Sequence, residues 1–263
     1  MSESPLVRTY ADSGALIVGG TSGVGLATAL GLAGAGVRRM VLVGRDKERG
    51  DAARQAVREH HPDAGVHFIS ADATDESEVE RVVSTAHREL GSLDICVNST
   101  TTAYRPELLH RTPATDFSGI LTGQALPPML FTRAVLPLMQ EQGGGSIVNI
   151  ASDAAKVPTP GESVLGAAMA AIVMFSRVAA IEAKRNGVRV NAVTPSLING
   201  TRTAANVLSD GFSRSLFEKA ATQAHLGVAE ADDLASLIVF LAGPGAARLT
   251  GQSISVNGGI SAF

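Results

Sequence analysis

Short apolar runs alternate along the chain with longer stretches in which apolar residues recur at helical spacing. The apolar runs predict strands at Ala15–Val18, Val37–Val43, Val66–Ser70, Leu93–Val97, Ser146–Ile150, Val188–Val193 and Ser253–Val256. The stretches between them predict helices, the first directly after Gly25 and others at about Lys47–Glu59, Asp75–Leu90, Ala114–Gln140, Ser163–Ala183 and Ala231–Ala242. Strands that alternate with long helices are typical of a parallel sheet with helices on both faces. Because no linker or repeat divides the chain, we expect one doubly wound α/β domain over residues 1–263.

Composition narrows the class of protein. The chain is 45% hydrophobic and 18% charged, with a net charge of −3, so no basic excess points to nucleic acid as a partner. Cys96 is the single cysteine, which favours a reducing, cytoplasmic compartment. The N-terminal residues carry no signal-peptide pattern. The longest apolar stretch, Gly166–Ala183, is interrupted by Ser176, Arg177 and Glu182, so we expect neither a membrane span nor a membrane partner.

A glycine-rich turn, GGTSGVG, lies between the first predicted strand and the first helix. At this place glycines allow a tight turn and the close approach of a pyrophosphate, which the helix N-terminus attracts. The expected contacts are Gly19, Ser22, Gly23, Val24 and Gly25. The alternative is a helix that needs glycines only to cross the sheet. The strand–turn–helix context favours a dinucleotide site.

The end of the second predicted strand bears on which dinucleotide binds. An acidic residue there hydrogen-bonds a free ribose hydroxyl, whereas an arginine accommodates a 2′-phosphate. Here Gly44 takes the place of the acid and Arg45 follows. We therefore expect NADP(H) over NAD(H) if a cofactor binds. The alternative is that Arg45 is an ordinary solvated charge in a stretch of mixed signs.

The segment from Ser152 into the helix at Ser163–Ala183 has the layout of an active site without its chemistry. A serine follows a strand, and a loop with proline and glycine leads into a helix. From Ser163 to Phe175, however, no side chain can exchange a proton, and the first ionisable one on this helix is Arg177.

Several motifs together resemble the short-chain dehydrogenase/reductase family over nearly the whole chain. VGGTSGVG resembles the family's TGxxxGxG with Val18 in place of threonine, VRVNAVTPS resembles VNxVxPG, and FLAGPGAARLTGQSISVNGG resembles its C-terminal signature. The resemblance implies a seven-stranded Rossmann-type sheet and a substrate lid at about 196–230. It implies cofactor contacts at Asp72, Ala73 and Asn98. It also implies pairing with a second chain through helices at about 114–140 and 163–183.

The resemblance further implies a catalytic tetrad of Asn, Ser, Tyr and Lys, of which one member matches. Ser152 corresponds to the serine, but Leu165 falls at the tyrosine position, Met169 at the lysine position and Gln124 at the asparagine position. Tyr104 is the best substitute for the missing acid. The remaining ionisable groups considered, for which an ordinary surface role is expected, are Asp153, Lys156, His110 and His225. No metal cluster is expected.

Three functions fit these losses. The favoured one is a non-catalytic structural subunit that is inactive alone. It would support a catalytically intact sibling in an NAD(P)-dependent 3-hydroxyacyl-thioester dehydrogenase acting on acyl-CoA or a carrier protein, such as that of benzylsuccinate β-oxidation. The second is an active NADP(H)-dependent keto- or enoyl-reductase with an atypical site that uses Ser152 and Tyr104. The third is a sensor that binds NADP(H) without turnover. Co-purification of a sibling, Tyr104→Phe and calorimetry would separate them.

Overall fold

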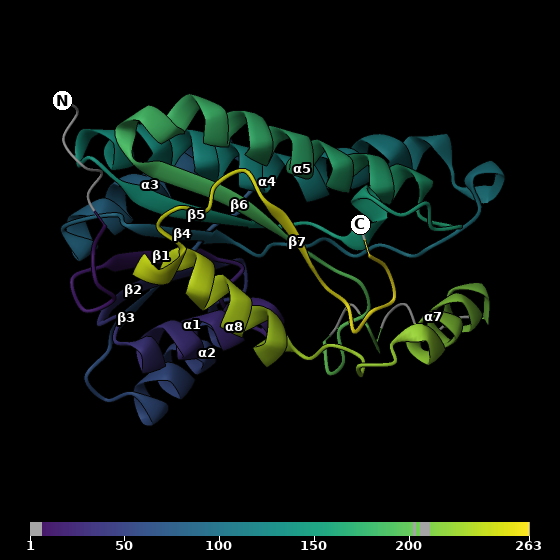
Figure 1. Ribbon diagram of the computed structural model, residues 1–263, viewed down its shortest axis with the longest axis horizontal. Helices are drawn as coiled ribbons and strands as arrows, with labels where there is room; N and C mark the ends of the chain where they lie inside the picture. Colours follow the sequence, from purple (N-terminus) through teal and green to yellow (C-terminus); the bar gives the residue numbers. More distant parts are fainter. Residues whose placement is uncertain (1–6, 202–203, 206–210, 263) are drawn as a thin grey trace.

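The chain folds around one sheet of seven parallel strands in the order β3-β2-β1-β4-β5-β6-β7. The computed structural model describes residues 7–201, 204–205 and 211–262 (Figure 1). The strands are β1 (Gly14–Val18), β2 (Arg39–Gly44), β3 (Gly65–Ser70), β4 (Ile95–Asn98), β5 (Gly145–Ile150), β6 (Val188–Pro195) and β7 (Ser253–Val256). The helices are α1 (Gly23–Ala35), α2 (Lys47–His60), α3 (Glu76–Leu90), α4 (Ala114–Glu141), α5 (Ser163–Ala183), α7 (Gly211–Gln223) and α8 (Ala231–Ala242). The seven-stranded doubly wound fold is thus confirmed.

Helices cover both faces of the sheet because side chains alternate across each strand. Ile17 and Leu42 belong to the core beneath α1, α2 and α8. Their neighbours Leu16 and Val41 belong to the core beneath α3, α4 and α5. Both faces of β1 and β2 are therefore buried, which explains why these strands are apolar runs without alternation.

Two predicted strands begin later than the apolar pattern indicated. Val37 belongs instead to the end of α1, since Gly36 adopts a left-handed conformation and the Val37 N–H donates to the Leu32 carbonyl. β4 begins only at Ile95, although the Asp94 N–H donates to the Gly14 carbonyl at 2.9 Å and the Asp94 carbonyl accepts the Ser146 N–H at 2.8 Å. Val37 and Leu93 are buried like the strand residues that follow them, so the apolar pattern extends each predicted strand too far.

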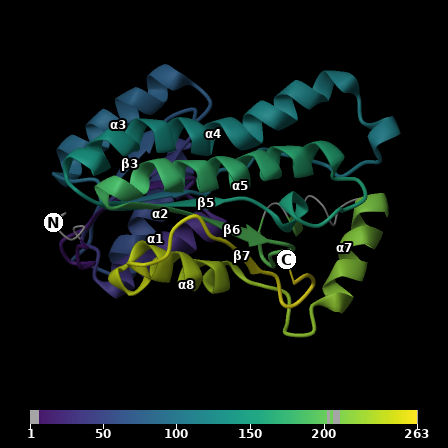
Figure 2. The same ribbon diagram turned by 45° about the horizontal axis from the view of Figure 1, so that its top comes forward.

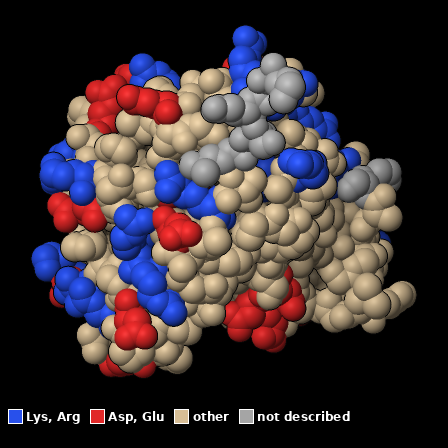
Figure 3. Space-filling model, turned by 60° about the vertical axis from the view of Figure 1, so that its left-hand side comes forward, with Lys and Arg blue, Asp and Glu red and all other residues tan. Residues whose placement is uncertain are grey.

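The carboxyl ends of the strands define the end of the molecule where a ligand is expected. In doubly wound folds ligands bind beyond these ends, where the loops gather. Helix α7, from the predicted lid, stands beside the beginning of α5 at this end (Figure 2). The segment 196–230 is therefore partly regular, with α7 and a bridge between Ile198 and Ala229. On the face opposite α7, basic and acidic side chains are interspersed (Figure 3).

The apolar helix α5 belongs to the core. By length and composition the segment Ser163–Asn186 could cross a membrane, but half of its most apolar window is buried inside the protein. The core helix of a globular protein passes the same test. Helix α5 packs along α4 and β6.

Candidate active site

The glycine turn after β1 approaches neighbouring backbone too closely for a side chain. Gly19 has a φ of 80°, and a β-carbon there would lie 2.5 Å from the Ser99 carbonyl oxygen. A β-carbon on Gly25 would overlap the Gly19 carbonyl oxygen. Gly23 has a φ of 49° and opens α1. The turn therefore has the shape that close approach of a phosphate requires.

The N-terminus of α1 keeps its hydrogen-bonding capacity. Ser22 is the N-cap residue, yet its side chain makes no capping hydrogen bond. Val24 points into the core, so its backbone and not its side chain is offered to the turn. Amide groups at a helix N-terminus that no side chain caps suit an anion. The residues present therefore fit the pyrophosphate of a dinucleotide.

A buried hydroxyl that sequence reasoning did not select also lies at the glycine turn. Among the described residues, Thr100 Oγ1 is buried and has no hydrogen-bond partner. The Thr100 backbone nitrogen lies 3.0 Å from the position that a β-carbon on Gly19 would occupy. A buried hydroxyl without a partner is costly, so a ligand that pairs with it would gain affinity. The sequence showed only extra bulk at this position.

Arg45 follows β2 at the place expected for the adenosine ribose. At Gly44 a β-carbon would lie 2.7 Å from Thr21 Cγ2, so an acidic side chain has no room there. The Arg45 side chain is exposed, and within the described part of the chain it forms no ion pair. Hydrogen bonds from the Thr74 backbone and side chain lower the pKa of Asp72, and the charge of Arg45 lowers it further. A cation is thus available near Asp72.

The predicted cofactor contacts after β3 and β4 are already hydrogen-bonded within the protein. Asp72 accepts the Thr74 N–H at 2.9 Å and the Thr74 hydroxyl at 2.7 Å, with Ala73 in the turn between them. Asn98 is buried and donates its Nδ2 to Asn149 Oδ1 at 2.7 Å. The Asn98 side chain thus ties β4 to β5. Cofactor contacts at Asp72, Ala73 and Asn98 stay a prediction. At Asn98 the backbone would make this contact, because the side chain is bonded to Asn149.

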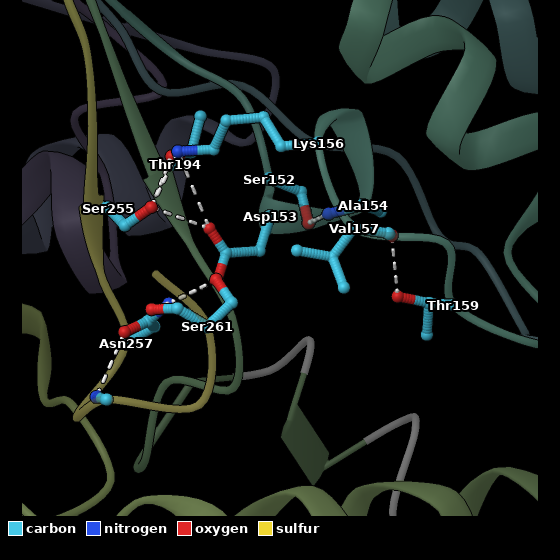
Figure 4. Close-up of polar contacts among 11 residues, drawn as sticks. Ser152, Asp153, Ala154, Lys156, Val157, Thr159, Thr194, Ser255, Asn257 and Ser261 are labelled. Carbon is cyan, nitrogen blue, oxygen red and sulfur yellow. Dashed lines mark hydrogen bonds and ion pairs between the residues drawn. The ribbon is translucent and has the colours of Figure 1, made fainter. Parts of the chain in front are cut away.

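Ser152 lies just beyond β5 with a hydroxyl that can still donate. Its Oγ accepts the Ala154 N–H at 3.2 Å (Figure 4). No group among the described residues accepts the Ser152 hydroxyl proton. A hydroxyl held in place by an incoming hydrogen bond, with its own proton unused, suits recognition of a carbonyl oxygen.

An apolar cluster occupies the places that the resemblance assigned to the acid and the lysine. Leu165 and Met169 are buried and form this cluster with Ala125 and Ala151, and the Tyr104 ring packs against it. Neither Leu165 nor Met169 can move a proton. Leu165 and Met169 therefore pack into an apolar cluster where the family has an ionisable tyrosine and a charged lysine.

Gln124 serves the neighbouring loop. Its Nε2 donates to the Thr102 carbonyl at 3.2 Å, and its Oε1 accepts from Thr101 Oγ1 at 3.4 Å. Gln124 is buried. The side chain therefore fixes residues 101–102 against α4.

The Tyr104 hydroxyl is committed to a backbone contact. It donates a hydrogen bond to the Gly161 carbonyl oxygen. Burial, followed by the charges of Glu162 and Glu107, raises the pKa of Tyr104 to about 12. Because the proton is both held tightly and already donated, Tyr104 is a weak acid in this arrangement.

Asp153 and Lys156 correct the expectation that they are surface groups. Both are largely buried, with 7% and 11% of their side chains exposed. Asp153 accepts hydrogen bonds from Ser255 Oγ at 3.0 Å, from Ser261 Oγ at 2.9 Å and from Asn257 Nδ2 (Figure 4). Lys156 Nζ donates to Ser255 Oγ at 2.6 Å. Asp153 and Lys156 thus hold the C-terminal segment against the loop after Ser152. The sequence did not indicate this contact, because the partners lie far apart along the chain.

Comparison with known proteins places this geometry in a family. A family model described as Enoyl-(Acyl carrier protein) reductase matches residues 18–261. A 3-oxoacyl-[acyl-carrier-protein] reductase of Synechocystis sp. is 30% identical over 250 residues, covering 95% of this chain and 97% of the relative. Levodione reductase of Leifsonia aquatica is 30% identical over 265 residues, covering 99% and 98%. The crystal structure of levodione reductase matches with a TM-score of 0.90 and 30% identity, over 96% of this chain and 99% of that one.

These relatives overturn the favoured expectation of a non-catalytic subunit beside an active sibling. They match over nearly their whole length and are named as reductases, so they point to an active reductase. The expectation rested on the losses at Leu165 and Met169, for which the sequence offered only Tyr104 as a substitute acid. Among the described residues there is no cluster of three or more potential metal ligands.

The chain belongs to the short-chain dehydrogenase/reductase family.

Proposed function

We propose that the protein is an NADP(H)-dependent ketone reductase with an atypical active site, in which Ser152 binds the carbonyl oxygen of the substrate. The single observation that carries this proposal is the Ser152 hydroxyl, whose Oγ accepts the Ala154 N–H while its own proton has no acceptor among the described residues. Family membership and relatives named as reductases support it.

The cofactor-binding half of the site is proposed on the basis of the glycine turn. The uncapped amides at the start of α1 would hold the pyrophosphate, and Thr100 Oγ1 would gain a partner there. Arg45 would pair with the 2′-phosphate, which favours NADP(H). When bound, the cofactor supplies a hydride to the substrate. A cytoplasmic location goes with this proposal.

In the substrate half, Ser152 would donate a hydrogen bond to the carbonyl oxygen as negative charge develops on it. Such a donor is worth about 10²- to 10³-fold in turnover when it is positioned in advance. The apolar cluster around Leu165 and Met169 would line the space beside the carbonyl and exclude water. The positions of the family's tyrosine and lysine thus shape this site without supplying a proton.

The test is turnover by the purified chain, measured with 3-oxoacyl-[acyl-carrier-protein] and with levodione and either NADPH or NADH. We expect NADPH-dependent formation of the alcohol and a fall of about 100-fold in kcat for Ser152→Ala. The matched control is Ser84→Ala, an exposed serine on α3, which should match wild type. Tight NADPH binding in calorimetry without turnover of any ketone would indicate the sensor instead. Reduction of an enoyl thioester alone would move the reaction to a carbon–carbon double bond.

We also propose that two copies pair through the outer face of α4 and α5. Met174, Val178 and Ile181 are large apolar side chains exposed along one side of α5, and Leu121 is exposed on α4. Such a stripe on a charged protein is unfavourable in water and favours self-association. Ile181, 61% exposed, is the best single probe. Sedimentation of Ile181→Glu should give monomer where wild type gives dimer or larger; an unchanged profile would contradict the proposal.

A further inference from the structure

The site described so far has a hydrogen-bond donor in Ser152 but no general acid that can transfer a proton to the substrate. One carboxyl group near it has no role so far. Glu162 is only 9% exposed, at the N-cap position of α5. Its side chain makes no capping hydrogen bond, and among the described residues its carboxyl group has no hydrogen-bond or ion-pair partner, so its oxygens are paired only where they reach solvent. Acidic side chains are almost never this buried without a partner. A stable but unpaired carboxyl group therefore calls for a functional reason.

The position of Glu162 on α5 aligns it with the replaced catalytic residues. It precedes Leu165 by three residues and Met169 by seven, so it lies at the N-cap, about one turn before Leu165. Long side chains on a helix lean back over the turn that precedes them. A tyrosine at position 165 would therefore reach toward the turn that contains Glu162. The Glu162 backbone thus lies in the turn toward which a phenol from position 165 would point.

The residue before Glu162 connects its turn to Tyr104 and to α7. The adjacent Gly161 carbonyl accepts both the Tyr104 hydroxyl and the Glu107 N–H, the latter at 3.0 Å. A β-carbon on Gly161 would lie 2.8 Å from the Phe212 ring, so α7 covers this point. Gly161, the residue before Glu162, therefore contacts both Tyr104, whose ring packs on the Leu165 cluster, and α7.

We propose, on the basis of the reductase function proposed above, that the Glu162 carboxyl group is the acid that protonates the carbonyl oxygen of the substrate. The Glu162 O–H bond would break and its proton would move to the carbonyl oxygen, while a bound cofactor would supply the hydride that the carbonyl carbon accepts. The products are the alcohol and a Glu162 carboxylate, which takes a proton back from water. Ser152 then orients the same oxygen, and Tyr104 positions the Gly161–Glu162 turn.

The electrostatics suit an acid that works near neutral pH. Burial raises the pKa of Glu162 to about 7. Among the described residues, no charged group contributes to this shift, and the Glu162 and Glu107 charges both act on the neighbouring Tyr104. On its own helix the first charge is Arg177, four turns away. A group that is half protonated at neutral pH is well matched to both donating and recovering a proton.

The kinetic test compares Glu162→Gln and Tyr104→Phe with wild type in ketone reduction. We expect kcat to fall about 100-fold or more in Glu162→Gln with a KM changed only a few-fold, because a positioned acid contributes about 10²- to 10⁴-fold. Reduction by wild type should decline as the pH rises through about 7, and this decline should be absent from the residual activity of Glu162→Gln. Tyr104→Phe should retain the pH dependence. A full rate in Glu162→Gln, or loss of the pH dependence in Tyr104→Phe only, would overturn the proposal.

A second measurement does not need turnover. Infrared difference spectra of the cofactor-free protein should show a protonated carboxyl band at pH 6 that titrates near pH 7 and is missing in Glu162→Gln. The control is Glu141→Gln, an exposed glutamate at the far end of α4, which should keep the band. If wild type reduces ketones but this band is absent, Glu162 is not the acid while the reductase function stands. If the band is present but no ketone is reduced, the proposed function fails and the acid role fails with it.

Discussion

Replacing Glu162 with glutamine should stabilise the protein at alkaline pH while it damages catalysis. Burial raises the pKa of this carboxyl group from its ordinary 4.5 to about 7 in the folded state. Below pH 4.5 the group is protonated in both states and costs nothing. Between pH 4.5 and about 7 the unfolded chain ionises while the folded chain stays neutral, so the free energy of unfolding falls. Since one pKa unit corresponds to about 1.4 kcal/mol, the complete loss above pH 7 is about 3.5 kcal/mol.

The assay is urea denaturation of wild type, Glu162→Gln and the control Glu141→Gln at pH 5 and pH 8.5. Glutamine stays neutral at both values, so Glu162→Gln should lack the part of the stability loss that wild type shows between them. The expected difference between the two proteins in this pH-dependent loss is about 3 kcal/mol. The control should follow wild type. Equal losses in wild type and Glu162→Gln would refute the inference that burial keeps this carboxyl group neutral.

Three further substitutions test other parts of the structure. Gly25→Ala should lower the free energy of unfolding by about 1–3 kcal/mol in urea denaturation and weaken NADPH binding, because its β-carbon would overlap the Gly19 carbonyl oxygen. An unchanged NADPH affinity in calorimetry would contradict a pyrophosphate site at the glycine turn. Arg45→Ala should weaken NADPH about 10- to 100-fold and leave NADH unchanged, as expected from losing a charge-assisted hydrogen bond; equal effects on both would remove Arg45 from the 2′-phosphate site. Asp153→Ala should lower the free energy of unfolding by about 3 kcal/mol, since Lys156 and two hydroxyls would lose a buried acceptor; a loss below 1 kcal/mol would show that the network is not structural.

Most of the fold could be predicted from the sequence because burial on both faces leaves a strong pattern. The strands beneath the helices are uninterrupted apolar runs, and α8 begins and ends where its pattern does, at Ala231–Ala242. The strand starts at residues 37 and 93 could not be placed, because Val37 and Leu93 are buried as deeply as the strand residues that follow them. Periodicity reports burial, and it distinguishes strand from turn only where burial differs.

Only part of the candidate site could be predicted from the sequence. The glycine turn and Ser152 stand in recognisable local patterns, so they could be selected. Glu162 and Thr100 could not, since a carboxyl or hydroxyl group in the sequence carries no sign of whether it is buried and unpaired. The Asp153 network was missed for a related reason, because its partners lie about a hundred residues away along the chain. Long-range contacts decide the chemistry of such groups.

The measurement that most directly tests the account is the reduction of 3-oxoacyl-[acyl-carrier-protein] and of levodione by the purified chain alone with NADPH. The account predicts that alcohol forms in proportion to protein, at a rate about 100-fold lower in Ser152→Ala than in the Ser84→Ala control. Absence of turnover with both substrates and with a panel of simple ketones would contradict it, as would equal rates in the two serine variants.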